Sequence, residues 1–255
     1  AQADPQGVYW TAVTDGERQR LELFVPAGID PASVRLAVNA VSHLVVGPQG
    51  SSDDAKALGD SGSCNKDVVC RTNLLGQAFV DLKDSVARMT FQSDGGTFTC
   101  TGTLLNDNAP ATQIPWFYTA HHCIGNQTEA STVTTFWKFE TPTCGVNNAG
   151  PNTQVPGGAQ LLYSQASTDG ALLRLNNAAP GGSVLLGWNA GSLTTPVAVL
   201  GVHHPRGDIK KVSTGSHTGV SQNVNIDGQI LSSALRSTWT EGTTEGGSSG
   251  SGLFT

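Results

Sequence analysis

Charged side chains are scarce in this chain of 255 residues: Asp, Glu, Lys and Arg make up 13% of it, and the formal net charge is −6. Such a chain lacks the electropositive surface that nucleic acid binding requires. No apolar run approaches the roughly 18 residues of a membrane-spanning helix, and the N-terminus AQADPQGVYW lacks the basic start and apolar stretch of a signal peptide. We therefore expect no nucleic acid partner and no membrane association, and any export signal would lie outside this sequence.

Cysteine is also limited, and its number is odd. The five cysteines include no C-x-x-C pair, which argues against a zinc knuckle or a redox motif. An extracellular disulfide framework fits better, although it leaves one thiol without a partner. Glycine, in contrast, is abundant at 31 residues, and with 12 prolines it favours many short strands over long helices. The cysteines are Cys64, Cys70, Cys100, Cys123 and Cys144.

Two parts of the chain differ in character. Residues 1–58 are expected to form a separate small unit with strand-like segments at 20–25 and 33–41, and the polar stretch 47–63 has the composition of an exposed linker. From Cys64 onward, short apolar segments alternate with turn signals at intervals of roughly ten residues, which predicts an all-β barrel or sandwich. The expected strands lie within residues 96–105, 115–120, 131–140, 170–175, 182–188, 195–204, 208–215 and 237–240.

Two further segments are less regular. Residues 144–160 are rich in Gly, Asn and Pro and are predicted to form a surface loop. Residues 68–87 are the one fair helix candidate, but their mixed apolar spacing leaves loop and strand open as well.

The first motif that suggests chemistry is TAHHC at residues 119–123. Adjacent histidines on a strand point to opposite faces, so they do not easily share a metal ion. Two interpretations remain. Either one histidine is packed and the other exposed, or one is a general base, for which an imidazole suits because its pKa lies near neutrality.

The second motif is STDGALLRL at residues 167–175. The Asp169-Gly170 pair is a common hairpin turn. Alternatively, Asp169 places a carboxylate at the edge of the sheet, where it could accept a hydrogen bond from an imidazole and fix its tautomer.

The third motif is EGGSSGSGLFT at residues 245–255. A run of Gly and Ser is typical of a flexible linker. It also suits a tight loop that presents a serine hydroxyl, because glycines let backbone N–H groups turn toward a substrate carbonyl.

Taken together, the order His, Asp, Ser resembles that of the chymotrypsin-type serine proteases. TAHHC resembles their histidine motif, in which the base directly precedes the cysteine, and this selects His122 over His121. TDGALLRL resembles the aspartate strand and identifies Asp169, and GSSGSG resembles the nucleophile loop and identifies Ser249. By the same resemblance, the amides of Gly247 and Ser249 form the oxyanion hole.

The chain is closer still to the bacterial lysyl endopeptidase branch, which SGSCNKDVVC (61–70), CTGTLL (100–105) and GVHHP (201–205) also resemble. The similarity covers residues 59–255, and residues 1–58 more weakly resemble the end of that branch's propeptide. The resemblance implies an all-β fold of two six-stranded antiparallel β-barrels, spanning residues 59–180 and 181–255. The second barrel is expected to lack its C-terminal strands, and a small β-rich propeptide remnant is expected to precede the first.

The resemblance also implies a disulfide pairing, and it reveals two positions at which this chain differs from trypsin-like enzymes. It pairs Cys70 with Cys144 and Cys100 with Cys123, and leaves Cys64 unpaired. Ser248 stands where trypsin-like enzymes carry the aspartate that captures a new N-terminus on activation, so that switch is not available to this chain. Thr243 stands where trypsin has its basic-specificity aspartate.

We therefore predict a secreted, monomeric serine endopeptidase that acts on protein or peptide substrates, needs no metal or organic cofactor, and by resemblance prefers lysine. Two alternatives remain: a secreted β-rich binding module, in which GSSGSG is a linker, and a protease-like fold without activity. His203 and His204 are expected to be packed or at the surface, with no chemistry of their own.

Overall fold

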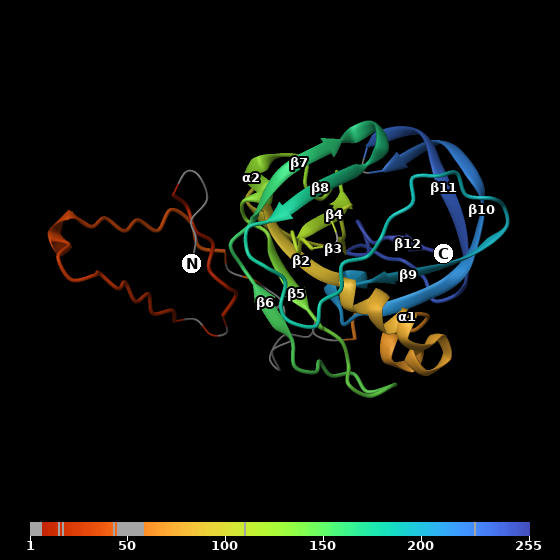
Figure 1. Cartoon of the computed structure of the whole chain (residues 1–255), viewed down its shortest axis with the longest axis horizontal. Coiled ribbons are helices and arrows are strands. Elements are labelled where there is room, and N and C mark those ends of the chain that lie inside the picture. Colours follow the sequence, from red (N-terminus) through yellow and green to blue (C-terminus); the bar gives the residue numbers. More distant parts are fainter. Residues whose placement is uncertain are drawn as a thin grey trace.

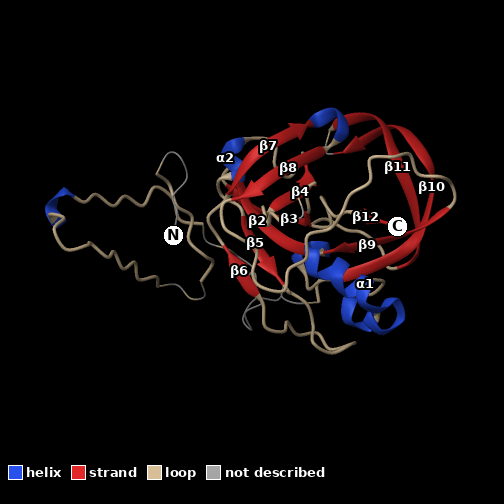
Figure 2. Cartoon of the chain, in the orientation of Figure 1, coloured by secondary structure: helices blue, strands red, loops and turns tan. Residues whose placement is uncertain are grey.

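The computed structural model describes residues 7–14, 16, 18–42, 44, 59–109, 111–226 and 228–255, and describes residues 73–75 by their backbone alone. Within these residues the chain forms two antiparallel sheets and few helices, which confirms the all-β prediction (Figure 1; Figure 2). No helix in this part of the chain is long and apolar enough to cross a membrane.

The larger sheet has seven strands. Its core contains the side chains of Met89, Leu104, Phe117, Trp137 and Leu173, all buried. In spatial order the strands are β6 (Thr153–Val155), β5 (Thr134–Trp137), β2 (Val86–Ser93), β3 (Gly96–Leu105), β4 (Trp116–Ala120), β8 (Gly170–Leu175) and β7 (Ala159–Gln165).

The turn between β2 and β3 shows how the local sequence fixes the register of this sheet. Ser93 pairs with Gly96, so Asp94 and Gly95 alone form the turn, and both have positive φ, at 47° and 77°. Asp-Gly favours this two-residue hairpin because each residue tolerates a left-handed backbone. The tight turn aligns β3 along β2, and β3 in turn pairs with β4, at whose end the histidines lie.

The second sheet has five strands and is dominated by a long two-stranded ribbon of β10 and β11 (Figure 1). The first strand of the chain belongs to this sheet, because Lys66 pairs with Val212 and Asp67 with Lys211. The strands are β1 (Lys66–Asp67), β10 (Lys211–Ile226), β9 (Val197–His203) and β12 (Leu253–Phe254) along one path, with β11 (Gln229–Glu241) on β10.

The helix candidate at 68–87 contains three elements in succession: η2 (Val68–Cys70), α1 (Thr72–Ser85) and the start of β2. Its mixed apolar spacing reflects this division, and Gly76 interrupts α1 with a positive φ of 65°. Phe79 of α1 is buried with Val202 and Val212, which places the helix against the second sheet. The remaining short helices are α2 (Gln127–Ala130), η1 (Pro31–Ser33), η3 (Ala166–Thr168) and η4 (Pro205–Gly207).

The N-terminal part of the chain differs from the prediction. Its described residues form an arm that extends away from the sheets and contains the short turn η1 but no strand (Figure 1). The expected β-rich character is therefore wrong for these residues. The physical reason is that a strand needs a neighbour to accept its backbone hydrogen bonds, whereas Phe24 and Val41 are 84% and 82% exposed. Most of the expected linker lies outside the described residues.

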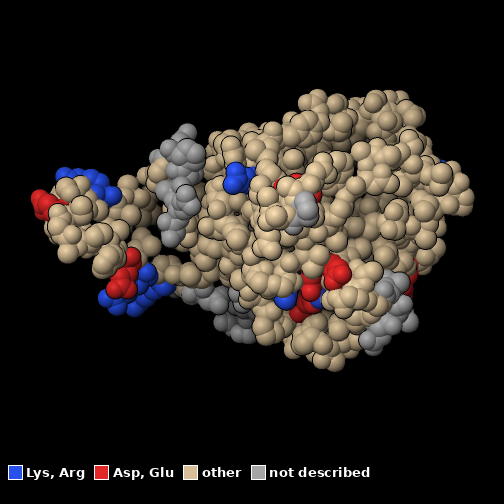
Figure 3. All heavy atoms as spheres, viewed as in Figure 1, with Lys and Arg blue, Asp and Glu red and all other residues tan. Residues whose placement is uncertain are grey.

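The arm contacts the larger sheet through hydrogen bonds and through packing of Val13 against the apolar cluster that contains Phe136. The Val13 amide donates to Gln154 Oε1 at 3.1 Å, and the hydroxyls of Ser42 and Thr97 lie 2.5 Å apart. Charged side chains are sparse on the face of the molecule shown in Figure 3, in keeping with their 13% share of the sequence.

Two smaller expectations were also wrong. The predicted surface loop at 144–160 contains β6 and the beginning of β7. The predicted strand at 182–188 makes one isolated bridge, between Leu186 and Leu105. In both cases the pairing partner, which the local composition does not reveal, decides whether a strand forms.

Candidate active site

His122 lies just beyond the end of β4, in a turn that is fixed from two sides. The Cys123 amide donates to the carbonyl of Ala120 at 3.2 Å, and a disulfide joins Cys123 to Cys100 of β3. Both cysteines are buried. The turn therefore follows the position of the sheet, and the imidazole of His122 starts from a rigid base.

Asp169 accepts hydrogen bonds from both the imidazole and the main-chain amide of His122. The imidazole Nδ1 lies 2.8 Å from Oδ2 and 3.0 Å from Oδ1, and the His122 amide donates to Oδ1 at 3.0 Å. The side chains are only 19% and 15% exposed. Because a carboxylate can only accept hydrogen bonds, the imidazole proton lies on Nδ1. Nε2 therefore has a lone pair that can accept a proton from another group.

Asp169 is oriented by its own backbone. It ends η3 and precedes β8 with a left-handed conformation, φ 51° and ψ 29°. Asp is one of the few residues that tolerates this region. Its carbonyl accepts from the His121 amide at 3.0 Å, and the next residue, Gly170, pairs with Ala120 of β4. The Asp-Gly pair is thus a turn, and the same turn directs a carboxylate at the imidazole.

His121 is directed elsewhere. Its Nδ1 lies 2.6 Å from the hydroxyl of Ser164 on β7, and that hydroxyl donates to the carbonyl of Ile124 at 2.8 Å. The two adjacent histidines therefore have separate partners. No group of three or more His, Cys, Asp or Glu side chains suited to a metal ion occurs among the described residues.

Residues 245–252, which we call the Ser249 loop, dock on the larger sheet. The Thr101 amide donates to the Ser249 carbonyl at 2.8 Å, and the Thr101 hydroxyl donates to the Gly247 carbonyl at 2.8 Å. A β-carbon on Gly250 would overlap Thr119 Oγ1 and the Thr101 carbonyl oxygen. The loop therefore lies directly against β3 and the end of β4, the strand that leads to His122.

The two amides expected to bind an oxyanion are unoccupied by protein. Neither the Gly247 nor the Ser249 N–H donates to an acceptor in the described part of the chain. Gly247 has a φ of 89°, and a β-carbon there would lie 2.8 Å from the His204 carbonyl oxygen. Among the described residues the Ser249 hydroxyl makes no hydrogen bond to His122, so of the three predicted catalytic residues the structure joins His122 and Asp169 by hydrogen bonds.

A buried histidine holds the residue before Ser249. His203 is completely buried, with Nδ1 at 2.8 Å from the Ser248 hydroxyl and Nε2 at 3.1 Å from the Ser213 hydroxyl. Ser213 donates to the Thr243 carbonyl at 2.8 Å, so it accepts from Nε2–H. Ser248 accepts from the Glu245 amide at 3.1 Å and donates to Nδ1. Every donor in this chain of bonds has an acceptor.

This arrangement requires His203 to be neutral. Burial lowers the pKa of its imidazole from 6.5 to about 4, since a charged ring would lose its hydration. His204 is equally buried, and burial, followed by the nearby charge of Lys210, lowers its pKa well below the usual value. Both histidines are packed, as predicted, although His203 also bonds to the Ser249 loop.

The cysteines pair as the resemblance implies. Disulfides join Cys70 to Cys144 and Cys100 to Cys123, while Cys64 is free and exposed. Cys70 ends η2 beside β1, so the first of these bonds fixes the start of the second sheet to the loop after β5.

Comparison of the sequence with models of known families identifies the family of this chain. The family model described as lysyl endopeptidase, C-terminal domain, matches residues 58–255, and that described as lysyl endopeptidase N-terminal domain matches residues 1–45. The chain belongs to the lysyl endopeptidase family. A lysyl endopeptidase of Pseudomonas aeruginosa is 40% identical over 259 residues, a match that covers 97% of this chain and 53% of that protein. The chain thus spans about half the length of the curated relative that it matches.

The solved structures that match this lysyl endopeptidase family member are more distant from it in sequence. An inactivated protease paralogue of the scabies mite has a TM-score of 0.49 at 15% identity, covering 69% of this chain and 80% of its own. A thermostable serine protease from an extremophilic microorganism has a TM-score of 0.46 at 16% identity, covering 68% and 78%.

Several residues that shape the site were not predicted individually as site residues. Thr101 lies in the strand motif CTGTLL, His203 in GVHHP, and Glu245 at the start of the serine-rich run. Each belongs to a motif that the resemblance to lysyl endopeptidases already singled out. The sequence does not show that Thr101 and His203 both bond to the Ser249 loop, because residues far apart in the chain must first be brought together by the two sheets.

Proposed function

We propose that this chain carries the catalytic residues of a serine endopeptidase, with Ser249 as nucleophile, His122 as general base and Asp169 as the group that orients His122. The observation that carries the proposal is the bond from His122 Nδ1 to Asp169, at 2.8 Å. It leaves Nε2 as the acceptor for a serine proton, which is the tautomer that the reaction needs.

The reaction would proceed through an acyl-enzyme. Ser249 Oγ attacks the peptide carbonyl while His122 Nε2 takes the hydroxyl proton, and the Gly247 and Ser249 amides stabilise the oxyanion. His122 then gives the proton to the leaving amine. Water adds to the acyl-enzyme with His122 again as base, which releases the acid and restores Ser249.

This role requires Ser249 Oγ to come within hydrogen-bond distance of His122 Nε2. Hydrogen bonds between catalytic groups are often loose until substrate binds, and the Ser249 loop already rests on Thr101 beside the end of β4. The unoccupied Gly247 and Ser249 amides support the same assignment.

We also propose the setting in which this activity works. Residues 1–58 act as part of a propeptide with its linker, residues 59–180 form the unit with His122 and Asp169, and residues 181–255 form the unit with Ser249. The enzyme is secreted and monomeric, cleaves proteins or peptides, and prefers lysine before the cleaved bond. The disulfides support export, and the printed name of the 40% identical relative supports lysine.

A phosphonate probe specific for activated serines tests the proposal. We expect covalent labelling that maps to Ser249 and is lost in Ser249→Ala. A Ser251→Ala variant in the same loop is the matched control and should label as the wild type does. Absence of labelling under conditions where the chain is folded would favour the alternative, a secreted binding module with no catalytic serine.

Substrate preference needs a separate measurement. Peptides that differ only in the residue before the cleaved bond, with lysine, arginine, leucine or glutamate there, should be cleaved fastest when it is lysine. Equal kcat/KM for all four peptides would contradict the lysine preference and leave the serine mechanism intact.

A further inference from the structure

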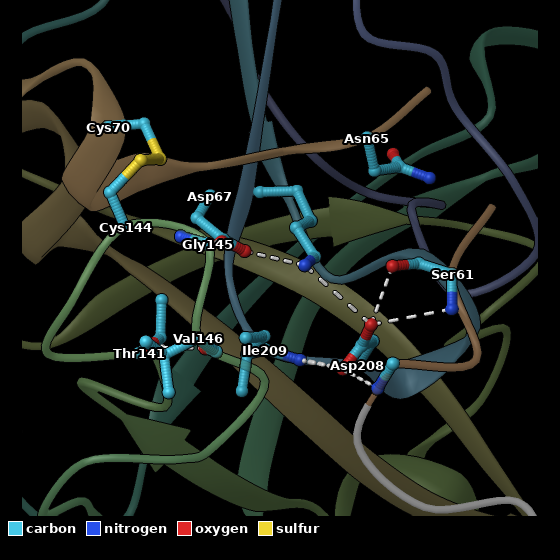
Figure 4. Close-up of polar contacts among 12 residues, drawn as sticks. Ser61, Asn65, Asp67, Cys70, Thr141, Cys144, Gly145, Val146, Asp208 and Ile209 are labelled. Atoms are coloured by element: carbon cyan, nitrogen blue, oxygen red, sulfur yellow. Dashed lines mark hydrogen bonds and ion pairs between the residues drawn. A yellow bond between two sulfur atoms is a disulfide. The ribbon is translucent and has the colours of Figure 1, made fainter. Parts of the chain in front are cut away.

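The segment Gly59–Asn65, which we call the strap, crosses from the turn η4 to the Ser249 loop without belonging to a helix or a strand. Figure 4 shows Ser61 beside Asp208 at one end of it. Gly59 has a φ of 98°, and a β-carbon there would overlap the side chain of Asn147. The strap is thus closely fitted at its first residue.

Asp208 anchors the beginning of the strap. Its Oδ1 accepts from the Gly59 amide at 2.9 Å, and its Oδ2 accepts from the Ser61 amide at 3.3 Å and the Ser61 hydroxyl at 2.5 Å (Figure 4). Oδ1 also accepts from the Ile209 amide at 2.7 Å. The side chain of Asp208 is completely buried. Three of the four donors within hydrogen-bond distance of this carboxylate therefore come from the strap, and all four are neutral.

Two cations, Lys211 and Arg88, interact with Asp208, and each also bonds to another group. Lys211 Nζ is 3.8 Å from Asp208 but only 2.6 Å from Asp67. Arg88 is buried, and its guanidinium donates to the Gly207 carbonyl at 2.8 Å. The ion pair with Lys211 is long, so the buried Asp208 carboxylate depends on its hydrogen bonds for much of its stability. Loss of the strap would leave Asp208 with one main-chain donor.

Glu245 anchors the other end of the strap. Its Oε2 accepts from the Gly62 amide at 2.9 Å and from Asn65 Nδ2 at 2.8 Å, and its Oε1 accepts from Arg206 Nε at 3.0 Å. The Gly62 amide, followed by Asn65 and Arg206, outweighs burial and lowers the pKa of the Glu245 carboxyl. Glu245 is also the first residue of the Ser249 loop, so this anchor acts directly on that loop.

Both anchors reach the residues next to Ser249. Asp208 follows η4, and within η4 the Arg206 amide donates to the Gly246 carbonyl at 2.5 Å. The Glu245 amide donates to the Ser248 hydroxyl, which His203 also holds. A hydrogen bond to a charged group is about twice as strong as one between neutral groups. The strap therefore adds charge-assisted bonds to Glu245, the first residue of the loop, and to Asp208, which follows the turn η4 that contacts Gly246.

We propose that the strap holds the Ser249 loop in its working conformation, with Asp208 and Glu245 as the positioning residues. The proposal rests on the proposed function, because the working conformation is the one that presents Ser249 and the two oxyanion amides. Ser248 stands where trypsin-like enzymes use an aspartate to capture a charged N-terminus. Here the main-chain amides of an internal segment supply the equivalent restraint, whether or not the chain is cut before Gly59.

Hydrogen exchange of the full chain tests the strap without any measurement of activity. The Ser248 and Ser251 amides, both hydrogen-bonded inside the loop, are the reporters. In Ser61→Ala and Asp208→Asn we expect them to exchange about tenfold faster or more, since the loop opens more often when bonds to a charged group are lost. The exposed Ser63→Ala is the matched control and should stay within about twofold of the wild type. Unchanged exchange in both strap variants would overturn the proposal.

The amides of β3 show whether a variant has simply lost stability. They should exchange as in the wild type in Ser61→Ala, the milder of the two changes. If β3 and the loop accelerate together in Ser61→Ala, the strap supports the whole fold and not the loop, which also contradicts the proposal.

Catalysis provides a second readout. Ser61→Ala should lower kcat about tenfold and leave KM within about twofold, because the loop aligns the oxyanion amides and does not bind the substrate side chain. If the phosphonate labels neither the wild type nor any variant, the proposed function fails, and the exchange result still decides the fate of the strap.

A last experiment tests whether the main-chain amides of the strap or a charged α-amino group at Gly59 holds the Ser249 loop. A recognition sequence placed before Gly59 lets a site-specific protease cut so that Gly59 becomes the first residue, and a second version leaves one extra glycine in front of it. Both cut forms should have the same kcat and loop exchange within about twofold. A tenfold loss in the form with the extra glycine would show that a free α-amino group at Gly59 does the holding, and would overturn the strap as proposed.

Discussion

At the scale of single residues, the two neighbouring histidines of TAHHC are distinguished by their partners. His122 bonds to Asp169, whereas His121 bonds to Ser164 on β7. We expect His122→Ala and Ser249→Ala to lower kcat by several orders of magnitude, since each removes a member of a unit that works together. His121→Ala should cost less than about tenfold. Steady-state kinetics with one peptide substrate compares the three, and equal losses at His121 and His122 would contradict the choice of base.

His203 gives the molecule a specific sensitivity to acid. The folded chain keeps it neutral down to a pKa of about 4, whereas in the unfolded chain it binds a proton below about 6.5. Between these values the unfolded state binds more protons, so the free energy of unfolding falls as the pH falls, by at most about 3 kcal/mol from this group. His204 acts in the same direction.

The variant His203→Gln tests this contribution of His203 to stability. It should be less stable than the wild type at pH 7.5, because the bonds to Ser248 and Ser213 are disturbed, and should lose less stability between pH 6.5 and pH 4. Urea unfolding at a series of pH values measures both effects. Parallel stability curves for the two proteins would show that His203 titrates normally in the folded state.

At the scale of elements, the fit of the Ser249 loop against β3 depends on glycine. Gly250→Ala places a β-carbon where Thr119 Oγ1 and the Thr101 carbonyl oxygen lie, at a φ of 83°. We expect it to displace the loop, lower stability by about 1–3 kcal/mol and lower kcat by more than about a hundredfold. Gly246→Ala is the matched control, because no atom lies within 4 Å of its new β-carbon. Thermal unfolding and kinetics of the two variants should differ clearly, and similar values would mean that the loop is not closely packed.

The strands show what sequence reasoning could reach. The predicted limits of β3 and β8 are confirmed, since both are short runs of strand-forming residues bounded by turn signals. β6 was missed, and the segment 182–188 was predicted as a strand but makes a single bridge, because neighbours supplied by the tertiary structure decided the outcome. The His122–Asp169 pair followed from motif order. The bond between Ser248 and His203 could not be predicted from the sequence, since it depends on how the Ser249 loop packs against β9.

At the scale of the whole molecule, the disulfides predict how many cysteine thiols of the native protein can react. Cys64 is exposed and free, and the other four cysteines are paired. Alkylation of the native protein followed by peptide mapping should therefore find label on Cys64 alone. A native disulfide from Cys64 to any of the other four, or label on one of them, would contradict this arrangement. Sequence separations of 74 and 23 residues imply that the two disulfides contribute about 4 and about 3 kcal/mol.

The backbone at Asp169 also bears on how the protein ages. In an Asp-Gly sequence the aspartate side chain readily cyclises onto the next backbone nitrogen, and the succinimide so formed reopens largely to isoaspartate. Here Gly170 is a buried strand residue that pairs with Ala120, and the Tyr118 hydroxyl fills the space beside its α-carbon. Because β8 holds the Gly170 backbone in place, we expect cyclisation to be slower in the folded chain than in the unfolded one. Chains kept unfolded lack this protection, so they would gradually lose the carboxylate geometry at His122 and refold with a damaged site.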